Sequence, residues 1–178
     1  MAQYLSKNFT LEEMIASDTA KAKNISNKPS AYHKKILKHT CEYLLEKVRA
    51  LLNEKYKEYK GKEVKQVILK ITSGYRSPQL NAAVGGATNS QHVSGCAADV
   101  EAQIVYKDGK KEVLPFNVLY EDIKAWTKEG KVSVDQCIQE QSGSARWTHL
   151  SLPPQIRDCR KQFLKYSNGM YRMDCILK

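Results

Sequence analysis

The side chains best suited to chemistry lie in residues 90–99, which read SQHVSGCAAD. His92 and Asp99 are separated by six residues, and Gly95 lies between them. The glycine permits a tight turn, and the segment from Ala97 onward is typical of a β-strand. Alternation along that strand places Asp99 on the opposite face from its immediate neighbours. This pattern allows a histidine from a loop to approach an aspartate from a strand.

A second histidine lies in the strand predicted over residues 147–152, where alternation puts Trp147 and His149 on the same face. Together with His92 and Asp99, His149 would supply two imidazoles and one carboxylate. Catalytic Zn²⁺ sites use such sets because three protein ligands leave one coordination position open for water. Zinc lowers the pKa of that water and polarises a carbonyl, so these residues predict metal-assisted hydrolysis. Other divalent metals could accept the same ligands.

Hydrolysis of an amide also requires a group that takes a proton from water and delivers it to the leaving amine. Glu140 is the candidate, because it ends the strand predicted over residues 134–140 and a hairpin brings that strand beside His149. Alternation puts Glu140 in phase with the apolar Ile138 and Val134. We therefore expect a bulge or the strand end to turn Glu140 towards the site.

Each of these residues also has a structural alternative, because two histidines and an acid occur together by chance in most proteins. His92 could form a hydrogen bond within its loop, and Asp99 could cap the start of a strand. Glu140 could be a solvated surface charge. Spacing alone leaves these alternatives open.

The elements that position these residues are typical of an α+β protein. Apolar residues at helical spacing predict one long amphipathic helix over residues 31–59, and a Val- and Ile-rich run predicts a buried strand over 64–72. The other predicted elements are a short helix from Leu11, strands at 97–106, 134–140 and 147–152, a helix over 115–129, and hairpins turning at Asp108-Gly109 and Asn168-Gly169. The predicted fold is an antiparallel β-sheet with helices packed on one side.

The 178 residues contain no repeat or long linker, so a single domain over residues 1–178 is expected. The net charge is +10, which favours anionic partners but also fits a solvated lysine-rich surface. Much of the surplus comes from residues 55–65 and 107–111, which lack the arginine cluster or helix-turn-helix pattern of a specific nucleic-acid reader. A nucleic-acid-binding function would rest on charge alone and leave the histidines unexplained.

No apolar run approaches the roughly 18 residues that cross a bilayer, and the N-terminus lacks the pattern of a secretory signal peptide. We therefore expect neither a transmembrane segment nor a signal peptide. The five cysteines show no zinc-finger spacing and are interpreted as buried thiols in a reducing compartment. A bridge between Cys159 and Cys175 is left open.

At these residues the chain resembles the zinc D-Ala-D-Ala carboxypeptidases and peptidoglycan endopeptidases, in their compact single-domain branch. Four blocks match in order, from about residue 8 to residue 152: NFTLEEMIAS, ITSGYRSPQLNAAVGGATNSQH, HVSGCAAD, and DQCIQE with WTHLS. The resemblance implies a hedgehog/DD-peptidase-like fold. The hairpin IVYKDGKKEVL is longer than the family minimum, and the segment after Pro154 has no counterpart.

Carried over residue by residue, the resemblance implies Zn²⁺ bound by His92, Asp99 and His149. It implies that Glu140 acts as general base and general acid. A structural zinc would need no such carboxylate.

The resemblance also implies substrate-binding residues. Arg76 would bind a substrate carboxylate or the tetrahedral oxyanion through its planar, two-pronged donor, and its alternative is a structural role in the loop. Ser90 and Gln91 would line the same cleft. Trp147 would form a substrate wall or simply belong to the core.

The implied function is zinc-dependent hydrolysis of an amide bond in peptidoglycan stem peptides, as a D,D-carboxypeptidase or endopeptidase, with a phage-type endolysin as one form of such an enzyme. We expect a monomer that is synthesised in the cytoplasm and acts on the cell wall after release or export. The alternative is a non-catalytic, zinc-containing wall-binding module of the same fold, as in the signalling domain of hedgehog proteins.

Overall fold

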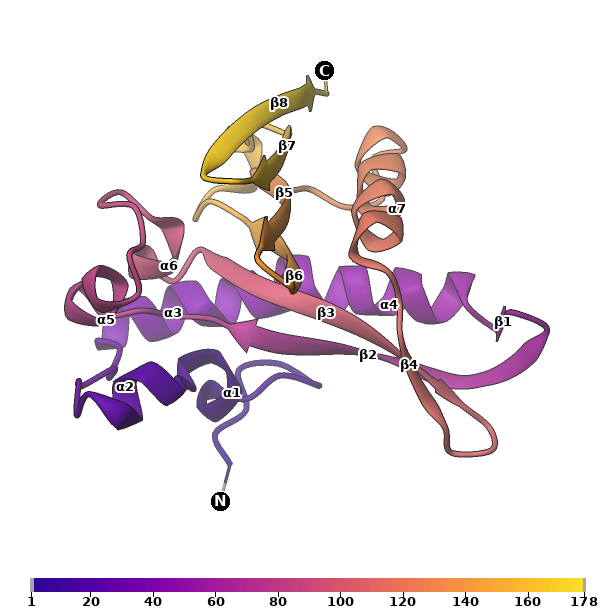
Figure 1. Ribbon diagram of the computed structural model, residues 1–178, viewed down its shortest axis with the longest axis horizontal. Helices are drawn as coiled ribbons and strands as arrows, with labels where there is room; N and C mark the ends of the chain where they lie inside the picture. The colour runs from indigo at the N-terminus through magenta and orange to yellow at the C-terminus, as the bar shows by residue number, and fades with distance from the viewer. Residues whose placement is uncertain (1, 178) are drawn as a thin grey trace.

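The computed structural model describes residues 2–177 of the chain, and its described part contains an eight-stranded sheet (Figure 1). The strand order is β1-β2-β3-β6-β5-β7-β8, and β4 pairs with β3 beside this path. The strands are β1 (Glu58–Tyr59), β2 (Lys62–Ser73), β3 (Ala97–Tyr106), β4 (Lys111–Val113), β5 (Gln136–Ser142), β6 (Ala145–Ser151), β7 (Gln162–Ser167) and β8 (Met170–Ile176).

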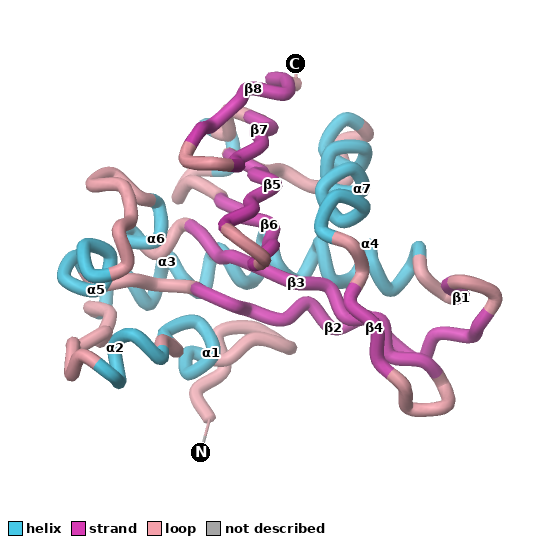
Figure 2. Tube along the Cα trace, viewed as in Figure 1, coloured by secondary structure: helices cyan, strands magenta, loops and turns pink. Residues whose placement is uncertain are grey.

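Helices precede, interrupt and cover this sheet, so the α+β class is confirmed (Figure 2). They are α1 (Leu11–Ile15), α2 (Asp18–Ala22), α3 (Ala31–Thr40), α4 (Glu46–Lys55), α5 (Pro78–Ala83), α6 (Gln91–Ser94) and α7 (Phe116–Lys128). A π-helical turn, Cys41–Leu45, joins α3 to α4, and a short 3₁₀-helix covers Ile156–Asp158.

The long helix is shorter than the sequence predicts. It ends at Lys55, whereas the prediction continued to Tyr59. Tyr59 instead pairs with Lys62 in a β1–β2 hairpin. Lys60 and Gly61 both adopt positive φ angles, of 51° and 71°, which is the backbone that a tight two-residue hairpin turn requires. Pairing with β2 therefore overrides the helical pattern at this end.

One face of the sheet carries the hydrophobic core. Ala98, Leu150, Cys137 and Phe163 are paired successively across β3, β6, β5 and β7, and all four are fully buried. Helices α3, α4 and α7 contribute to the same core cluster, and Tyr120 of α7 packs edge-on against Phe163. Because side chains alternate along each strand, the residues next to this row point to the opposite face.

The sheet is not wholly antiparallel, so that part of the prediction is wrong. Strand β7 pairs in parallel with β5, through Gln136 with Gln162 and Glu140 with Tyr166. The tight hairpin between β5 and β6 already places β5 at the edge of β6. The chain must therefore pass beyond β5 before it can add another strand. The connection over residues 152–161 makes that step, and the predicted hairpin at Asn168-Gly169 then forms between β7 and β8.

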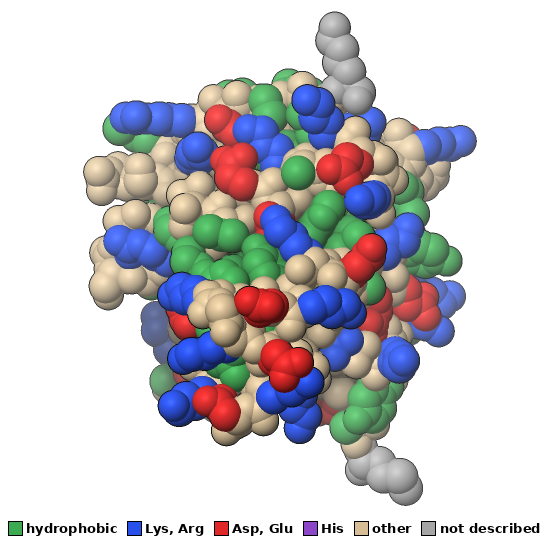
Figure 3. Space-filling model, turned by 90° about the vertical axis from the view of Figure 1, so that its right-hand side faces the viewer, with side chains coloured by type: hydrophobic (Ala, Val, Ile, Leu, Met, Phe, Trp, Pro, Cys, Tyr) green, Lys and Arg blue, Asp and Glu red, His purple; other side chains and the backbone are tan. Residues whose placement is uncertain are grey.

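The surface charge is mixed on the side shown in Figure 3. There, Lys and Arg side chains are interspersed with Asp and Glu around a central area of hydrophobic side chains. This view shows no continuous basic stripe of the kind that follows a nucleic-acid backbone. Within residues 2–177, no helix has both the length and the apolar character needed to cross a membrane.

Candidate metal centre and its cleft

The turn that carries His92 is built by local sequence. Ser90 caps the short helix α6, with its Oγ accepting a hydrogen bond from the His92 N–H at 3.4 Å. Gly95 ends the helix in the left-handed region, at φ 79° and ψ 9°. A Cβ at this position would lie 3.3 Å from the carbonyl oxygen of His33, so glycine serves both the turn and the close approach to α3. The chain then enters β3.

Strand pairing brings the other two candidate ligands together. Asp99 of β3 lies directly opposite His149 of β6. The Asp99 Oδ1 atom is 3.0 Å from His149 Nδ1 and 3.2 Å from His92 Nε2, and the two imidazole nitrogens are 3.2 Å apart. All three side chains are buried. The structure therefore unites the three residues that the sequence suggested as a metal site.

Their hydrogen bonds fit a divalent cation. His92 Nδ1 lies 2.7 Å from the carbonyl oxygen of Gly74, and a carbonyl can only accept, so Nδ1 carries the proton. The lone pair of Nε2 is then free to point at a metal, with Gly74 as the outer partner that metal-binding histidines usually have. One ligand atom from each of His92, Asp99 and His149 lies within 4.8 Å of the others.

Asp99 is held as a carboxylate. Burial by itself would raise its pKa, but the electrostatic attraction of the nearby His92 and His149 imidazoles outweighs this effect and lowers the pKa well below its usual range. Arg76, which follows β2, donates from Nη2 to Asp99 Oδ2 at 2.7 Å and from Nε to Ser73 Oγ at 3.0 Å. Arg76 thus lies beside the candidate metal ligands.

Glu140 faces the same cleft without the bulge or strand-end reorientation that the sequence predicts. The pairing of β5 with β6 is regular, with Ile138 opposite His149 and Glu140 opposite Trp147. Ile138 itself lines the cleft, so being in phase with it places Glu140 correctly. Burial, and then the negative charge of Asp99, raise the pKa of Glu140 to about 7. This carboxyl can therefore bind or release a proton near neutral pH.

These side chains line a cleft of about 570 Å³. It contains all of the predicted site residues: Arg76, Ser90, Gln91, His92, Asp99, Glu140, Trp147 and His149. Trp147 is half-buried on the cleft wall rather than enclosed in the core. The structure thus brings the predicted residues together, while their individual roles stay predictions.

The C-terminal segment contributes a wall that sequence reasoning missed. Arg160, Leu164, Tyr166 and Tyr171 also line the cleft. Tyr166 is paired with Glu140, and Tyr171 is paired with Tyr166, with their rings 4.6 Å apart. The alternation of Leu164 and Tyr166 signals one face of a strand. It does not signal that this strand lies beside β5.

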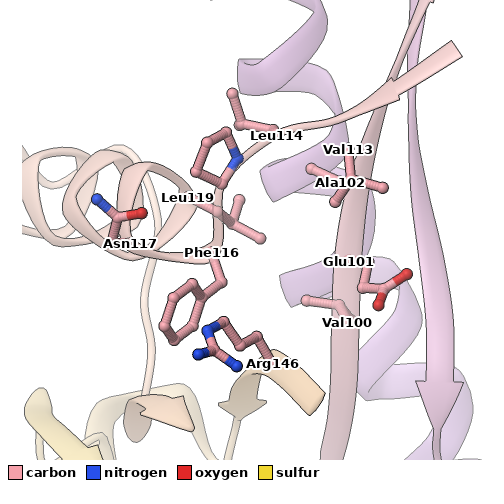
Figure 4. A pocket seen from close by; sticks show the side chains of 10 residues that line it. Val100, Glu101, Ala102, Val113, Leu114, Phe116, Asn117, Leu119 and Arg146 are labelled. Atoms are coloured by element: carbon pink, nitrogen blue, oxygen red, sulfur yellow. The ribbon is translucent and has the colours of Figure 1, made fainter. Parts of the chain in front are cut away.

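A second, apolar pocket of about 270 Å³ lies apart from the candidate metal ligands, between the start of α7, β3 and β4 (Figure 4). The Arg146 guanidinium lies over the Phe116 ring at 5.9 Å from its centre. Arg146 also donates to the carbonyl oxygens of Gly143 and Ser144. None of the predicted site residues lines this pocket, and Arg146 is engaged with its own hairpin.

A buried set of two imidazoles and a carboxylate, beside a carboxyl that titrates near neutrality, defines a candidate metallohydrolase. The sequence profile described as Peptidase M15 matches residues 7–114, and the chain belongs to this family. Family membership implies a metal-dependent peptidase, typically with zinc. The matched region includes His92 and Asp99 and ends before β5 and β6. A search of curated proteins found no match to this chain.

Proposed function

We propose that this protein hydrolyses an amide bond in the peptide stems of peptidoglycan, as a zinc D-Ala-D-Ala carboxypeptidase-like enzyme of hedgehog/DD-peptidase-like fold. The observation that carries the proposal is the arrangement of Asp99, His149 and Glu140 on one sheet face. Asp99 and His149 are paired, and Glu140 is on the next strand of the same cleft.

His92, Asp99 and His149 would hold the zinc ion, because their ligand atoms converge and the proton on His92 Nδ1 faces Gly74. When bound, zinc polarises a carbonyl and lowers the pKa of coordinated water. The two histidines and one aspartate leave coordination positions for such groups.

Glu140 would take a proton from the attacking water and pass it to the leaving amine. Burial beside Asp99 raises the pKa of this carboxyl in the metal-free protein, and a carboxyl that can both accept and release a proton suits both steps. Arg76 would bind a substrate carboxylate or the oxyanion that forms during attack, and its position in the cleft with Nη2 on Asp99 supports this role.

The substrate class rests on the resemblance of the sequence blocks and on charge. The net charge of +10 would favour docking to an anionic cell wall, with a loss of binding as salt increases. We propose that the protein acts as a monomer on the wall after release or export from the cytoplasm, in the manner of a phage-type lysin or of an exported bacterial enzyme.

The test is digestion of purified peptidoglycan by the wild-type protein, by EDTA-treated protein and by Glu140→Ala, with the metal content of each sample measured. We expect released stem peptides or D-alanine from the wild type only, and mass spectrometry would identify the bond. Glu140→Ala should retain its zinc. Binding of zinc and wall by the wild type without any product would reject this function and support the wall-binding module.

A further inference from the structure

The C-terminal segment places a second guanidinium in the cleft. Arg160 lines the cleft together with Gln91 and lies outside the matched family region. Its side chain is 49% exposed, although it is anchored to the buried carboxylate of Asp135. A cationic side chain that is fixed at one edge and open at another has the character of a binding group rather than of a mobile surface arginine.

Asp135 fixes this guanidinium through one edge only. Arg160 Nε lies 2.9 Å and 3.1 Å from the two Asp135 oxygens, and Nη2 lies 2.5 Å from Oδ2. The Arg160 backbone N–H also donates to Oδ1 at 2.9 Å. Among residues 2–177, no hydrogen bond is found from Nη1. The edge formed by Nη1 and Nη2 therefore keeps donors for a ligand.

The same carboxylate orients the neighbouring amide. Gln91 Nε2 donates to Asp135 Oδ2 at 2.8 Å. Exchanging the amide oxygen and nitrogen would set an oxygen against the carboxylate, so this orientation is fixed by charge. Gln91 Oε1 is buried and accepts no hydrogen bond from any residue in the described part of the chain. Gln91 therefore helps to hold the Asp135 carboxylate that orients Arg160.

We propose that Arg160, held by Asp135 beside Gln91, forms a substrate subsite that binds an oxygen of the peptide through the open edge of its guanidinium. This subsite deepens the proposed peptidase function and rests on it. Gln91 precedes the ligand His92, so the subsite adjoins the candidate metal centre. The bound oxygen can come from an internal carbonyl or from the terminal carboxylate, and these sources would distinguish an endopeptidase from a carboxypeptidase.

Binding can be separated from turnover in a zinc-loaded Glu140→Ala background. The ligands are a synthetic stem pentapeptide that ends in D-Ala-D-Ala and its C-terminal amide, measured by calorimetry. Arg160→Lys keeps the charge beside Asp135 but loses the planar donor, and we expect about tenfold weaker binding. Arg157→Lys is the matched control, because its side chain is 81% exposed and does not line the cleft.

If Arg160→Lys loses affinity only for the pentapeptide with a free C-terminus, the bound oxygen belongs to the terminal carboxylate. An equal loss for the pentapeptide and its C-terminal amide would show that the bound oxygen belongs to an internal carbonyl. Unchanged affinity in Arg160→Lys, an equal loss in Arg157→Lys, or no peptide binding would overturn the subsite. If Arg160→Lys does not fold, NMR of the Glu140→Ala protein replaces it. The side-chain N–H signals of Arg160 and Gln91 should then shift with peptide, and that of Arg157 should not. If the wild type releases peptide and Arg160→Lys leaves peptide affinity unchanged, the subsite is rejected and the peptidase function still stands.

Discussion

Ile138 on β5 lies directly opposite His149 on β6, and both side chains line the cleft. The apolar residue is therefore part of the cleft face of the sheet, and Glu140, two positions further along β5, shares that face. This relationship places the candidate proton carrier beside the candidate metal ligands through regular strand pairing alone.

Loss of either histidine should abolish metal binding. In His92→Ala and in His149→Ala, two of three ligands are too few to hold zinc tightly, so we expect the bound zinc to fall from about one equivalent to a small fraction. Metal analysis after dialysis measures this change. His39→Ala on α3 is the control and should keep the wild-type content. Full zinc occupancy in both site variants would show that the metal binds elsewhere.

Replacing Glu140 should remove turnover and spare the metal. Because Glu140→Gln cannot accept a proton, we expect kcat on released stem peptides to fall by about 10²–10⁴-fold, with zinc content unchanged. Glu101→Gln is the matched control, since Glu101 is on β3 but does not line the metal cleft. A Glu140→Gln enzyme within a few-fold of wild-type kcat would contradict its role as general base.

The raised pKa of Glu140 should affect the stability of the metal-free protein. Between the ordinary carboxyl pKa of 4.5 and about 7, the folded state binds more protons than the unfolded chain. The contribution of Glu140 to the free energy of unfolding therefore decreases as pH rises through this range. Metal-free Glu140→Gln should be more stable than wild type at pH about 8, by on the order of 1–3 kcal/mol, and closer to it at pH about 5.

Urea denaturation of both metal-free proteins at the two pH values measures this difference. The comparison between the two proteins cancels the titration of groups that they share. A gap that is the same at both pH values would mean that Glu140 titrates normally in the fold.

Gly74 should be intolerant of a side chain. A Cβ here would lie 2.3 Å from the backbone oxygen of Met14, which itself accepts a hydrogen bond from the Tyr75 N–H. Gly74→Ala must therefore shift the carbonyl that holds His92 Nδ1. We expect a loss of about 1–3 kcal/mol in unfolding free energy and roughly 10–100-fold weaker zinc binding. Wild-type stability together with wild-type zinc affinity would show that the backbone yields without cost.

Several features of the site were predictable from the sequence because they depend on local geometry. The alternation of strand side chains placed Asp99 and His149 on defined faces, and the turn at Gly95 set His92 close behind the strand. The structure brings these residues together, in agreement with that reasoning. The strand over residues 97–106 was predicted with its observed bounds.

Other features were decided only by the tertiary structure, because they depend on which distant segments pair. The sequence pattern of β7 is the same whether it adds to β5 in parallel or forms a separate hairpin, so the cleft wall of Arg160, Tyr166 and Tyr171 was not predicted. For the same reason the apolar Ile138 led to the prediction that a bulge or the strand end reorients Glu140. An apolar residue in a strand indicates that its face of the sheet is shielded from water. Only the packed fold decides whether that face lies in the core or lines a cleft.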